Sequence, residues 1–329
     1  MASTAQAISG SGPREAAGAD ADAAVWVRGL VKRYGDVTAV DGIDFEVRLG
    51  NCLGLLGPNG AGKTTTIEIL EGLKRPDAGE ARVLGRTWGR DARAIQQRIG
   101  VQLQETEFQD KIRVQELLRL FRSFYPGGKD LEEVIDIIGL AEKRNAMVKT
   151  LSGGQKQRLS IGCAILSDPE VLFLDEPTTG LDPQARRRVW EVIETFKGAG
   201  GTVLLTTHYM EEAERLADDL IIIDHGRIIA RGSPQAIIAS LGVESLVRFS
   251  LMGAGAAGLD SEFGALEGVR QVRTDGDFVT LSVTQTRSVI VGLLELVAAR
   301  GLELDDLSTH RPTLEDVFVA LTGKSLSDE

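Results

Sequence analysis

The stretch Gly57-Pro58-Asn59-Gly60-Ala61-Gly62-Lys63-Thr64 decides the fold of this chain. It fits the pattern G-x-x-x-x-G-K-[ST] of a phosphate-binding loop, and Thr65 adds a further hydroxyl. The apolar residues 52–56 before it are typical of a buried strand, and residues 64–73 after it suit a helix. Glycines let the backbone close around an anion, while the helix N-terminus points unpaired N–H groups toward it. The stretch therefore predicts a strand–loop–helix unit that binds nucleotide phosphates.

Two side chains of this loop have expected roles toward ATP and Mg²⁺. Lys63 is expected to reach the β- and γ-phosphates, and the Thr64 hydroxyl is expected to hold the metal ion. The alternative is an ordinary glycine-rich turn, although the pattern should arise by chance in only roughly one per cent of chains of this length. The motifs that follow make the nucleotide site the better interpretation.

An acidic pair ends a second apolar segment. Residues 171–174 are Val-Leu-Phe-Leu, as expected for a parallel strand covered on both faces. Asp175 and Glu176 follow at the edge where such strands present ligands. One carboxylate can hold Mg²⁺ through water, and the next can polarise the attacking water. We predict that Asp175 is a metal ligand and Glu176 the catalytic base; an ordinary strand end before a turn at Pro177 is the alternative.

A second glycine-rich segment precedes another predicted helix. Ser152, Gly153 and Gly154 lie directly before residues 155–167, which begin with Gln155 and suit a helix. A Ser-Gly-Gly sequence at a helix N-terminus can bind a phosphate, or it can simply cap the helix. A chain with one phosphate loop has no obvious need for a second phosphate site, whereas two copies that share their sites do. The segment thus favours an active site built between two copies.

Together, the phosphate loop, Leu-Ser-Gly-Gly-Gln at 151–155 and Val-Leu-Phe-Leu-Asp-Glu at 171–176 resemble the ATP-binding subunit of ATP-binding cassette (ABC) transporters. More narrowly, the chain is similar to bacterial multidrug and antibiotic exporter ATPases of the daunorubicin-resistance type. The resemblance implies an α/β P-loop NTPase fold, with a mixed core sheet, an antiparallel β subdomain and a helical subdomain. It also implies ATP and Mg²⁺ as cofactors.

The resemblance extends to a dimer and to single residues. In that family two cassettes form a head-to-tail dimer, and each ATP lies between one phosphate loop and the partner's Leu-Ser-Gly-Gly-Gln segment. Ser152 and Gly154 would then contact the γ-phosphate bound to the other copy. Further roles are implied for four residues: stacking on adenine for Tyr34, contact with Mg²⁺ and sensing of the membrane partner for Gln104, linkage of the two sites for Asp182, and contact with the γ-phosphate for His208.

Three of these assignments have plain alternatives. Tyr34 can be a surface tyrosine. Gln102 lies two positions before Gln104, although the spacing after the preceding apolar segment favours Gln104. His208 follows the apolar residues 202–205 and can be a structural cap. Its place after the acidic pair, behind one predicted helix, favours a site residue.

Composition limits the function. The chain has 329 residues and a net charge of −11, with a pI near 5.0. A nucleic-acid surface needs clustered positive charge, so we expect no nucleic acid among the partners. Cys52 and Cys163 lie in apolar segments without ligand spacing, which predicts buried free thiols in a reducing cytoplasm.

No membrane-spanning segment is expected in this sequence. No stretch approaches the roughly 18 apolar residues of a transmembrane helix, and the N-terminus lacks the basic and apolar regions of a signal peptide. A transporter subunit of this kind needs a separate transmembrane permease. We expect it at the cytoplasmic face of the cell membrane, attached through that permease.

Four segments are expected along the chain. Residues 1–24 are rich in Ala, Gly, Ser and Asp with almost no large apolar groups, which predicts a disordered leader. Residues 25–243 are predicted to form the ABC nucleotide-binding domain, residues 244–323 a small α+β accessory domain and residues 324–329 a tail. The nucleotide-binding domain opens with alternating segments that predict an antiparallel sheet.

Aromatic residues gather in the predicted helical stretch at residues 105–150. This stretch and its borders contain Phe108, Phe121, Phe124 and Tyr125, in a chain with only 5% aromatic residues. In the resembling family the region forms a groove that receives a short cytoplasmic helix of the membrane subunit. The alternative is that the rings fill the core of a small helical lobe, and both interpretations stay open.

The residues from 244 to 323 alternate between strand and helix patterns in the order β-α-β-β-α-β. We expect a strand at 247–251, a short helix at 261–267 and a hairpin at 272–283. A longer helix at 287–300, a strand at 302–307 and a last helix at 313–321 are expected to follow. The hairpin would turn at Asp275-Gly276. The order predicts a ferredoxin-like, split β-α-β domain.

The last predicted helix begins with Thr-Leu-Glu-Asp-Val-Phe at 313–318. This segment is similar to the tail of antibiotic-exporter ATPases, and the resemblance suggests dimer support or regulation. No catalytic set of side chains stands out in the accessory domain, and we expect His310 at the surface.

The leading hypothesis is the ATP-hydrolysing subunit of an exporter for drugs, antibiotics or similar amphiphilic compounds. A second hypothesis keeps the enzyme but makes it part of an importer, or of a lipid or polysaccharide exporter. A third is a cassette ATPase that acts on ribosomes or DNA. The single set of motifs, the absence of cysteine clusters and the absence of long heptad runs disfavour the third.

Overall fold

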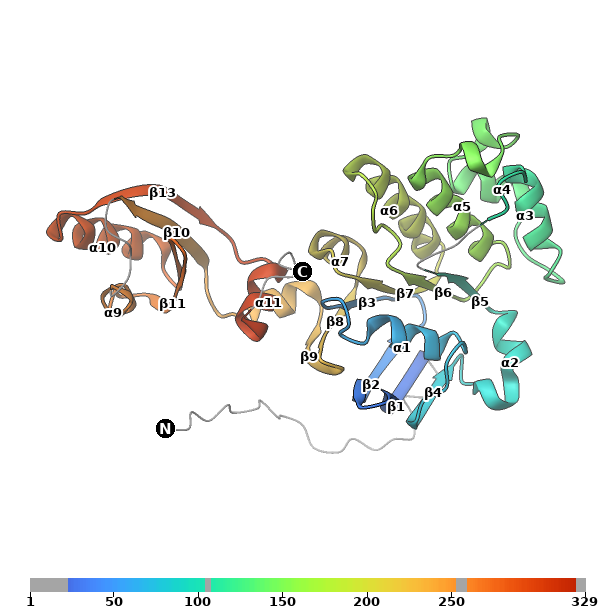
Figure 1. The fold of residues 1–329 in the computed structure, drawn as a ribbon, viewed down its shortest axis with the longest axis horizontal. Coiled ribbons are helices and arrows are strands. Elements are labelled where there is room, and N and C mark those ends of the chain that lie inside the picture. Colours follow the sequence, from blue (N-terminus) through green and yellow to red (C-terminus); the bar gives the residue numbers. More distant parts are fainter. Residues whose placement is uncertain (1–22, 104–107, 253–258, 324–329) are drawn as a thin grey trace. The chain divides into compact units, whose positions relative to one another are not determined.

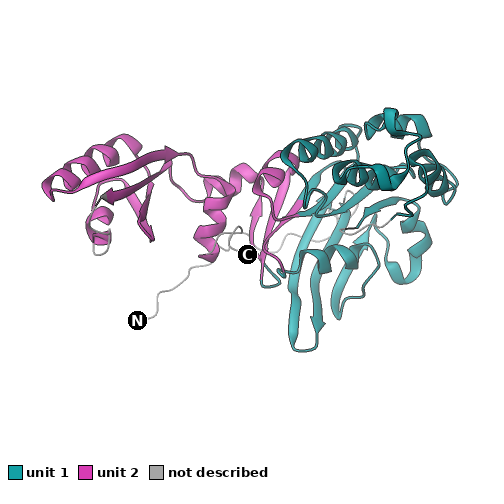
Figure 2. Cartoon of the chain, turned by 45° about the horizontal axis from the view of Figure 1, so that its top comes forward, with its two compact units in different colours: residues 1–53, 60–206, 225–227 teal, residues 54–59, 207–224, 228–329 magenta. Residues whose placement is uncertain are grey.

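The computed structural model describes residues 23–103, 108–252 and 259–323. The chain divides into two compact units, coloured separately in Figure 2. Unit 1 comprises residues 1–53, 60–206 and 225–227, and unit 2 comprises residues 54–59, 207–224 and 228–329. The predicted domain boundary between residues 243 and 244 falls inside unit 2 and stays a prediction.

Strands and helices alternate along most of the chain (Figure 1). The strands are β1 (Ala23–Tyr34), β2 (Val37–Arg48), β3 (Cys52–Leu56), β4 (Ala78–Val83), β5 (Ile99–Gln102), β6 (Val171–Asp175), β7 (Thr202–Thr207), β8 (Asp219–Asp224), β9 (Arg227–Gly232), β10 (Ser245–Met252), β11 (Val269–Asp275), β12 (Phe278–Val283) and β13 (Glu303–His310). The helices are α1 (Lys63–Leu70), α2 (Trp88–Gln96), α3 (Val114–Arg122), α4 (Leu131–Ile137), α5 (Gly153–Ile165), α6 (Pro183–Gly198), α7 (Met210–Leu216), α8 (Pro234–Ala239), α9 (Asp260–Gly264), α10 (Thr286–Ala299) and α11 (Leu314–Thr322), with 3₁₀ turns at Ala141–Lys143 and Val148–Thr150.

An antiparallel sheet with the order β2-β1-β4 forms one layer of unit 1, as predicted. Its first strand begins at Ala23, so the leader predicted for residues 1–24 is two residues too long. Ala24 is fully buried, and its carbonyl accepts the Leu84 N–H at 2.7 Å. Alanine carries too little apolar surface for the sequence pattern to signal this strand end.

The parallel strands β5, β6 and β7 form the core of unit 1. Val171 of β6 pairs with Ile99 of β5 on one side and with Thr202 of β7 on the other. Every residue of β6 is buried, as predicted for a parallel strand covered on both faces. The strand order in unit 1 is β5-β6-β7-β3, and in unit 2 the end of β3 is followed by β8 and β9. Because β5 and β6 are parallel, their carboxyl ends meet at the edge of the sheet where Asp175 lies.

Helices α3, α4 and α5 pack together in unit 1. Gly162 of α5 lies close to the end of α4, because a Cβ there would come within 2.8 Å of the Ile138 side chain. The predicted helical stretch at 105–150 is confirmed over the part that the structure describes, as two helices and two 3₁₀ turns.

Both cysteines are buried and free, as predicted. Burial raises the pKa of the Cys163 thiol, so this side chain keeps its proton at neutral pH. Over the described ranges, no helix combines the length and the apolar character needed to cross a bilayer.

Helix α1 ends three residues earlier than its apolar pattern predicts. Gly72 adopts a φ of +79°, and the Leu73 N–H donates to the Glu68 carbonyl at 2.9 Å, which closes the helix. A Cβ at Gly72 would also lie 2.4 Å from the Trp88 ring. Both the backbone angle and the close ring therefore require glycine at this position.

Glu71, the last residue before this glycine, is a buried acid. It is only 5% exposed, and neither carboxylate oxygen has a hydrogen-bond partner among the described residues. Burial, together with the nearby charges of Asp175 and Glu68, raises the pKa of Glu71 from 4.5 to about 8. Its ionisation therefore destabilises the folded chain.

We expect Glu71→Gln to flatten the pH dependence of stability. The folded wild type holds this proton up to about pH 8, whereas the unfolded chain loses it near pH 4.5. Wild-type stability therefore falls as the pH rises between these values, by up to about 5 kcal/mol. The melting temperature of the variant, relative to wild type, should increase from about pH 5 to about pH 9. A constant difference over that range would contradict the assignment.

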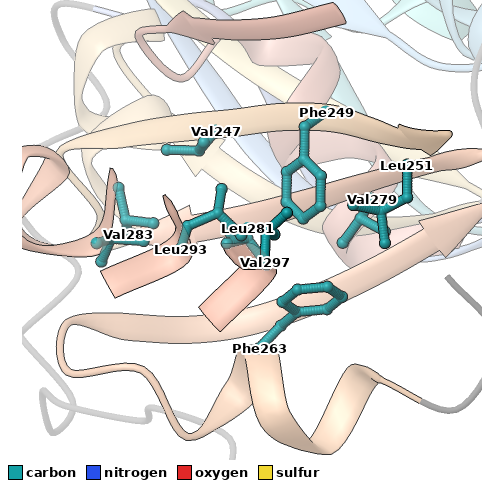
Figure 3. Close-up of a cluster of buried hydrophobic side chains, with 10 residues drawn as sticks. Val247, Phe249, Leu251, Phe263, Val279, Leu281, Val283, Leu293 and Val297 are labelled. Atoms are coloured by element: carbon teal, nitrogen blue, oxygen red, sulfur yellow. The ribbon is translucent and has the colours of Figure 1, made fainter. Parts of the chain in front are cut away.

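The C-terminal part of unit 2 contains a four-stranded antiparallel sheet with the order β11-β12-β10-β13. Its elements follow one another as β-α-β-β-α-β up to β13, and the strand order is that of a ferredoxin-like, split β-α-β arrangement. One face of the sheet packs against α9 and α10, with the Phe249 and Phe263 rings 5.2 Å apart edge to face (Figure 3). The β11–β12 hairpin turns at Asp275-Gly276, where Gly276 has a φ of +59°.

Helix α11 packs on a different part of unit 2. The Leu314 N–H donates to the Glu214 carboxylate of α7 at 3.2 Å. Leu314, Val317 and Phe318 are buried in a core shared with residues of α7, α8 and β8. The Thr-Leu-Glu-Asp-Val-Phe segment therefore has a structural role within one chain. His310, just before it, is exposed as expected.

Candidate nucleotide-binding site

The second half of the phosphate loop lies in unit 1 and has a backbone that requires glycine. Gly62 has a φ of +104° directly before α1, and a Cβ there would lie 2.2 Å from the Ala39 carbonyl oxygen. The Gly62 carbonyl accepts the Thr66 N–H at 2.9 Å, and the Ala61 carbonyl accepts the Gly226 N–H at 3.0 Å. The chain itself thus fixes the loop, while the first N–H groups of α1 have no acceptor within the helix.

Lys63 and Glu176 form a buried ion pair. Lys63 Nζ lies 3.5 Å from Glu176 Oε1, and the two side chains are 4% and 6% exposed. One comes from the start of α1 and the other directly follows β6, so the strand–loop–helix unit and the acidic pair meet as predicted from their motifs. Removing one member of such a pair leaves a buried charge uncompensated, which costs about 3–5 kcal/mol.

Oxygen-bearing side chains converge at the end of β6. Asp175 Oδ1 accepts hydrogen bonds from Thr64 Oγ1 at 3.3 Å and from Thr206 Oγ1 at 2.5 Å. Burial raises the pKa of the Asp175 carboxyl, and the hydrogen bond from Thr206 acts against this rise. Within the described ranges no cluster of three or more His, Cys, Asp or Glu side chains is placed to hold a metal. Mg²⁺ is commonly held by one or two carboxylates, phosphate and water, so Thr64 and Asp175 fit this ion.

Glu176 has a backbone conformation that is rare for a residue with a side chain. Its φ is +48°. Its N–H donates to Thr206 Oγ1 at 2.9 Å, and its Oε2 accepts from Thr179 Oγ1 at 3.0 Å. Strained backbone of this kind clusters at functional sites, where the surroundings hold one orientation. The Glu176 carboxylate is therefore fixed in place from both ends of the residue.

Sequence patterns do not single out Thr179 or Thr206, although both hold the acidic pair. Thr179 has a local signal, because it lies three residues after Glu176 and can reach the carboxylate. Thr206 has none, since it is 31 residues from Asp175 in sequence. The two meet only because β6 and β7 are parallel, with Asp175 opposite Thr206.

Ser152 caps helix α5. Its Oγ accepts the Gln155 N–H at 3.3 Å, and Gln155 Oε1 accepts the Ser152 N–H at 3.0 Å. Gly154 lies against α6, because a Cβ there would come within 2.7 Å of Ala185 Cβ. Within one chain the segment acts as a helix cap, the plainer of its two interpretations. Contact of Ser152, Gly153 and Gly154 with a phosphate held by a second copy stays a prediction.

Tyr34 and Asp182 are placed at the ends of elements in unit 1. The Tyr34 ring ends β1 and is 42% exposed, with the ammonium groups of Lys32 and Lys74 at 5.6 and 5.1 Å from its centre. An exposed ring beside two cations suits an adenine that carries phosphates. Asp182 caps α6 by accepting two backbone N–H groups, at 2.9 and 3.0 Å. The roles expected for both residues stay predictions.

Gln104 lies outside the described residues. Gln102, the alternative to it, ends β5 and is buried. Its amide N–H donates to the Leu103 carbonyl at 2.5 Å. The structure therefore leaves the expected contact of Gln104 with Mg²⁺ as a prediction.

The remaining predicted site residues belong to unit 2. Gly57, Pro58 and Asn59 follow the end of β3, and His208 follows β7. The His208 ring lies 4.2 Å from the Tyr209 ring. The contacts expected of these four residues with phosphate stay predictions.

Known proteins resemble this chain in sequence and in fold. A family profile described as ABC transporter matches residues 40–179. The daunorubicin resistance ATP-binding protein DrrA3 of Streptomyces coeruleorubidus is 40% identical over 308 residues, which cover 92% of this chain and 97% of that protein. The Nod factor export ATP-binding protein I of Ralstonia nicotianae is 40% identical over 312 residues, covering 92% and 94%. A solved structure described as the ATP binding subunit of an ABC transporter has a TM-score of 0.60 at 28% identity, and the match covers 66% of this chain and 93% of that one.

The similarities to the two named relatives extend over 92% of this chain and agree with the motifs. The solved structure has the predicted cassette fold, which confirms the fold class. The ion pair of Lys63 with Glu176 and the contact between Thr64 and Asp175 bring together residues of the two motifs. The chain therefore belongs to the ATP-binding proteins of ABC transporters, a family of P-loop ATPases.

Proposed function

We propose that this chain binds and hydrolyses ATP with Mg²⁺, and that it thereby drives export of amphiphilic compounds through a separate membrane subunit. The convergence of Lys63, Thr64, Asp175 and Glu176 in unit 1 carries the proposal. It brings one cation, two oxygen donors for a metal and one base to the carboxyl edge of a parallel sheet, where such sheets bind ligands.

The chemistry of these side chains accounts for the transfer of a phosphoryl group to water. When ATP binds, the Lys63 ammonium group, which pairs with Glu176 in this structure, also binds the phosphate oxygens. Glu176, oriented by Thr179, positions the attacking water and accepts its proton. Thr64 and Asp175 would hold Mg²⁺, which neutralises phosphate charge when bound. Catalysis then consists mainly of positioning and electrostatic stabilisation.

A second copy of the chain completes the site in this proposal. Ser152 and Gly154 lie at the N-terminus of α5, a position that suits an additional phosphate contact. His208 contributes to the γ-phosphate site and Asp182 links the two sites, as the family resemblance implies. ATP then lies between two copies, so ATP binding and dimer formation strengthen each other.

The names of the relatives support export and differ in cargo. One is named for daunorubicin resistance and the other for Nod factor export. We therefore propose an exporter of amphiphilic compounds such as drugs, with lipid or polysaccharide export as the alternative. The chain would act at the cytoplasmic face of the membrane, attached through the permease that contacts the cargo.

A cavity in unit 1 supports docking of that permease. Its volume is about 620 Å³, and its lining includes Phe108, Phe121, Phe124 and Tyr125. The Phe108 and Phe121 rings lie 6.1 Å apart, the Phe121 and Phe124 rings 5.8 Å apart, and Phe124 is 66% exposed. Rings that line an open cavity favour a docking surface over the alternative of a filled core, and a short amphipathic helix suits such a groove.

We expect Phe108→Ala to weaken attachment to the permease about tenfold and to change ATP affinity less than about twofold, because the ring lines the cavity and not the phosphate loop. Recovery of the permease and nucleotide titration measure the two effects. Leu321→Ala, which removes an exposed apolar side chain of α11, is the matched control and should change neither. Equal losses of permease and ATP binding in Phe108→Ala would contradict the proposal.

A pull-down from native membranes tests the proposed function. Tagged Glu176→Gln protein is added with ATP and Mg²⁺ to detergent-solubilised membranes, and the bound proteins are identified by mass spectrometry. We expect to recover a polytopic membrane protein, and to recover it only when the tagged protein can bind ATP. Recovery of ribosomal or DNA-bound proteins without a membrane protein would reassign the function and leave the ATPase chemistry in place.

A further inference from the structure

Glu71 is a buried acid in the lining of the aromatic cavity. It shares that lining with Leu73, Trp88 and the four rings of Phe108, Phe121, Phe124 and Tyr125. The lining is more apolar than polar, although it also includes Gln96 and Gln97, and no described side chain forms a hydrogen bond with either oxygen of the Glu71 carboxylate. An unpartnered carboxyl at this depth is costly in the ionised state, and its neutral form also leaves a buried polar group without a hydrogen bond.

The end of α1 next to Glu71 is held in place by Trp88. The Trp88 indole N–H donates to the Leu70 carbonyl at 2.8 Å. The same ring lies against Gly72, where a Cβ would come within 2.4 Å of it. Burial then raises the pKa of Glu71 to about 8, with added effects from Asp175 and Glu68. A cation placed beside it would relieve this cost.

The neighbouring segments of the chain do not place such a cation beside Glu71. Lys74 is engaged with Glu68, at 2.6 Å between Nζ and Oε2. Arg93 lines the same cavity but is exposed, and it forms no ion pair with Glu71 in the described part of the chain. Residues 104–107, which connect two cavity-lining positions in sequence, are Gln-Glu-Thr-Glu and contain no cation.

We propose that Glu71 is the charge-recognising residue of this cavity, and that the docking helix carries a lysine or arginine flanked by apolar side chains. The inference rests on the proposed function in one respect, since it takes a helix of the membrane subunit as the occupant. Lysine and arginine can bury their long stems along apolar and aromatic surfaces while the charged group reaches a distant partner. An ion pair formed away from water also gives orientation, because a misplaced helix leaves both charges unpaired.

Glu71 also connects the cavity with the phosphate site through one helix. α1 begins with Lys63 and ends directly before Glu71, over 8 residues or about 12 Å. Asp175 is among the charges that act on Glu71. A cation that docks beside Glu71 therefore changes the electrostatic field at the end of β6, where the acidic pair lies.

Two small probes test charge recognition in the full-length chain. 4-Phenylbutylguanidinium has an apolar body and a cation, and 4-phenylbutylurea is its neutral counterpart of similar shape. Binding is followed by Trp88 fluorescence at about pH 8, where Glu71 is about half ionised, with Trp88→Phe as the signal control. We expect the guanidinium compound to bind at least about tenfold more tightly to wild type, and Glu71→Gln to abolish this preference.

Glu68→Gln is the matched control, because Glu68 lies on the same helix and outside the cavity lining. It should keep the preference for the guanidinium compound. A synthetic amphipathic helix with a central arginine, compared with the same helix carrying norleucine there, should show the same preference and the same dependence on Glu71. Discrimination between the small probes without discrimination between the two helices would overturn the assignment of a helix as the occupant.

Other outcomes would overturn the role of Glu71 itself. The first is equal binding of the two compounds to wild type, and the second is an undiminished preference for the guanidinium compound in Glu71→Gln. The third is a preference for that compound that emerges only in Arg93→Gln, which would show that Arg93 already fills the site. ATP hydrolysis by the wild type is measured in parallel. Its absence would count against the proposed function and leave the probe result as a separate finding.

Discussion

Glu176→Gln is expected to hydrolyse ATP at least about 10²-fold more slowly than wild type, the scale of a lost general base. Glutamine has nearly the same shape and still offers an oxygen to the Thr179 hydroxyl, which lies 3.0 Å from the carboxylate in wild type. It cannot accept the proton of the attacking water. Single-turnover measurement of phosphate release reports the loss directly.

The same variant should keep its affinity for ATP, because Lys63 and the phosphate loop are unchanged. With hydrolysis slowed, ATP should hold two copies together for longer, and gel filtration with ATP and Mg²⁺ should show a larger share of dimer. Thr179→Val serves as a milder companion variant that removes the hydroxyl and leaves the base. Near-normal phosphate release by Glu176→Gln would remove Glu176 from its proposed role.

Lys63→Ala is expected to weaken ATP binding by at least about 10²-fold, because a buried, charge-assisted phosphate contact is lost. Unlike Glu176→Gln, it should fail at the binding step and not at the chemical step. Equilibrium binding of a fluorescent ATP analogue measures the difference. Saturation of Lys63→Ala at wild-type ATP concentrations would contradict the assignment.

Loss of stability has to be separated from loss of binding in this variant. Lys63→Ala leaves the Glu176 carboxylate buried without the ammonium group 3.5 Å away, which should destabilise the fold. The double variant Lys63→Ala with Glu176→Ala removes both charges and should recover much of that stability. It should still fail to bind ATP, which would show that Lys63 contributes to binding beyond its structural pair.

Local patterns in the sequence were sufficient to predict the central features of the site. The apolar segment at 52–56 is β3 without any shift, and the segment at 171–174 is β6 with Asp175 as its last residue. Gly62 directly precedes α1 and Lys63 begins it, as the phosphate-loop pattern requires. Such patterns are reliable because strand burial, glycine backbone angles and helix N-termini depend on residues close together in the chain.

Less could be predicted where distant residues meet. Thr206 supports Asp175 because two parallel strands place them opposite each other, and no pattern near either residue indicates this pairing. The early end of α1 depends on Gly72 lying against Trp88, which comes from another helix. A last helix at residues 313–321 was predicted, whereas the packing of α11 on α7 and α8 could not be.

The sequence by itself determined the family, the phosphate loop, the acidic pair and the order of the elements, since each of these is written in contiguous residues. Only the tertiary structure decided which side chains support the acidic pair, and that Glu71 is buried in an aromatic cavity without a described partner. The physical reason is that burial and hydrogen bonding between distant segments depend on how the layers pack. A sequence pattern records which face of an element is apolar, but not which residue of another element will lie against it.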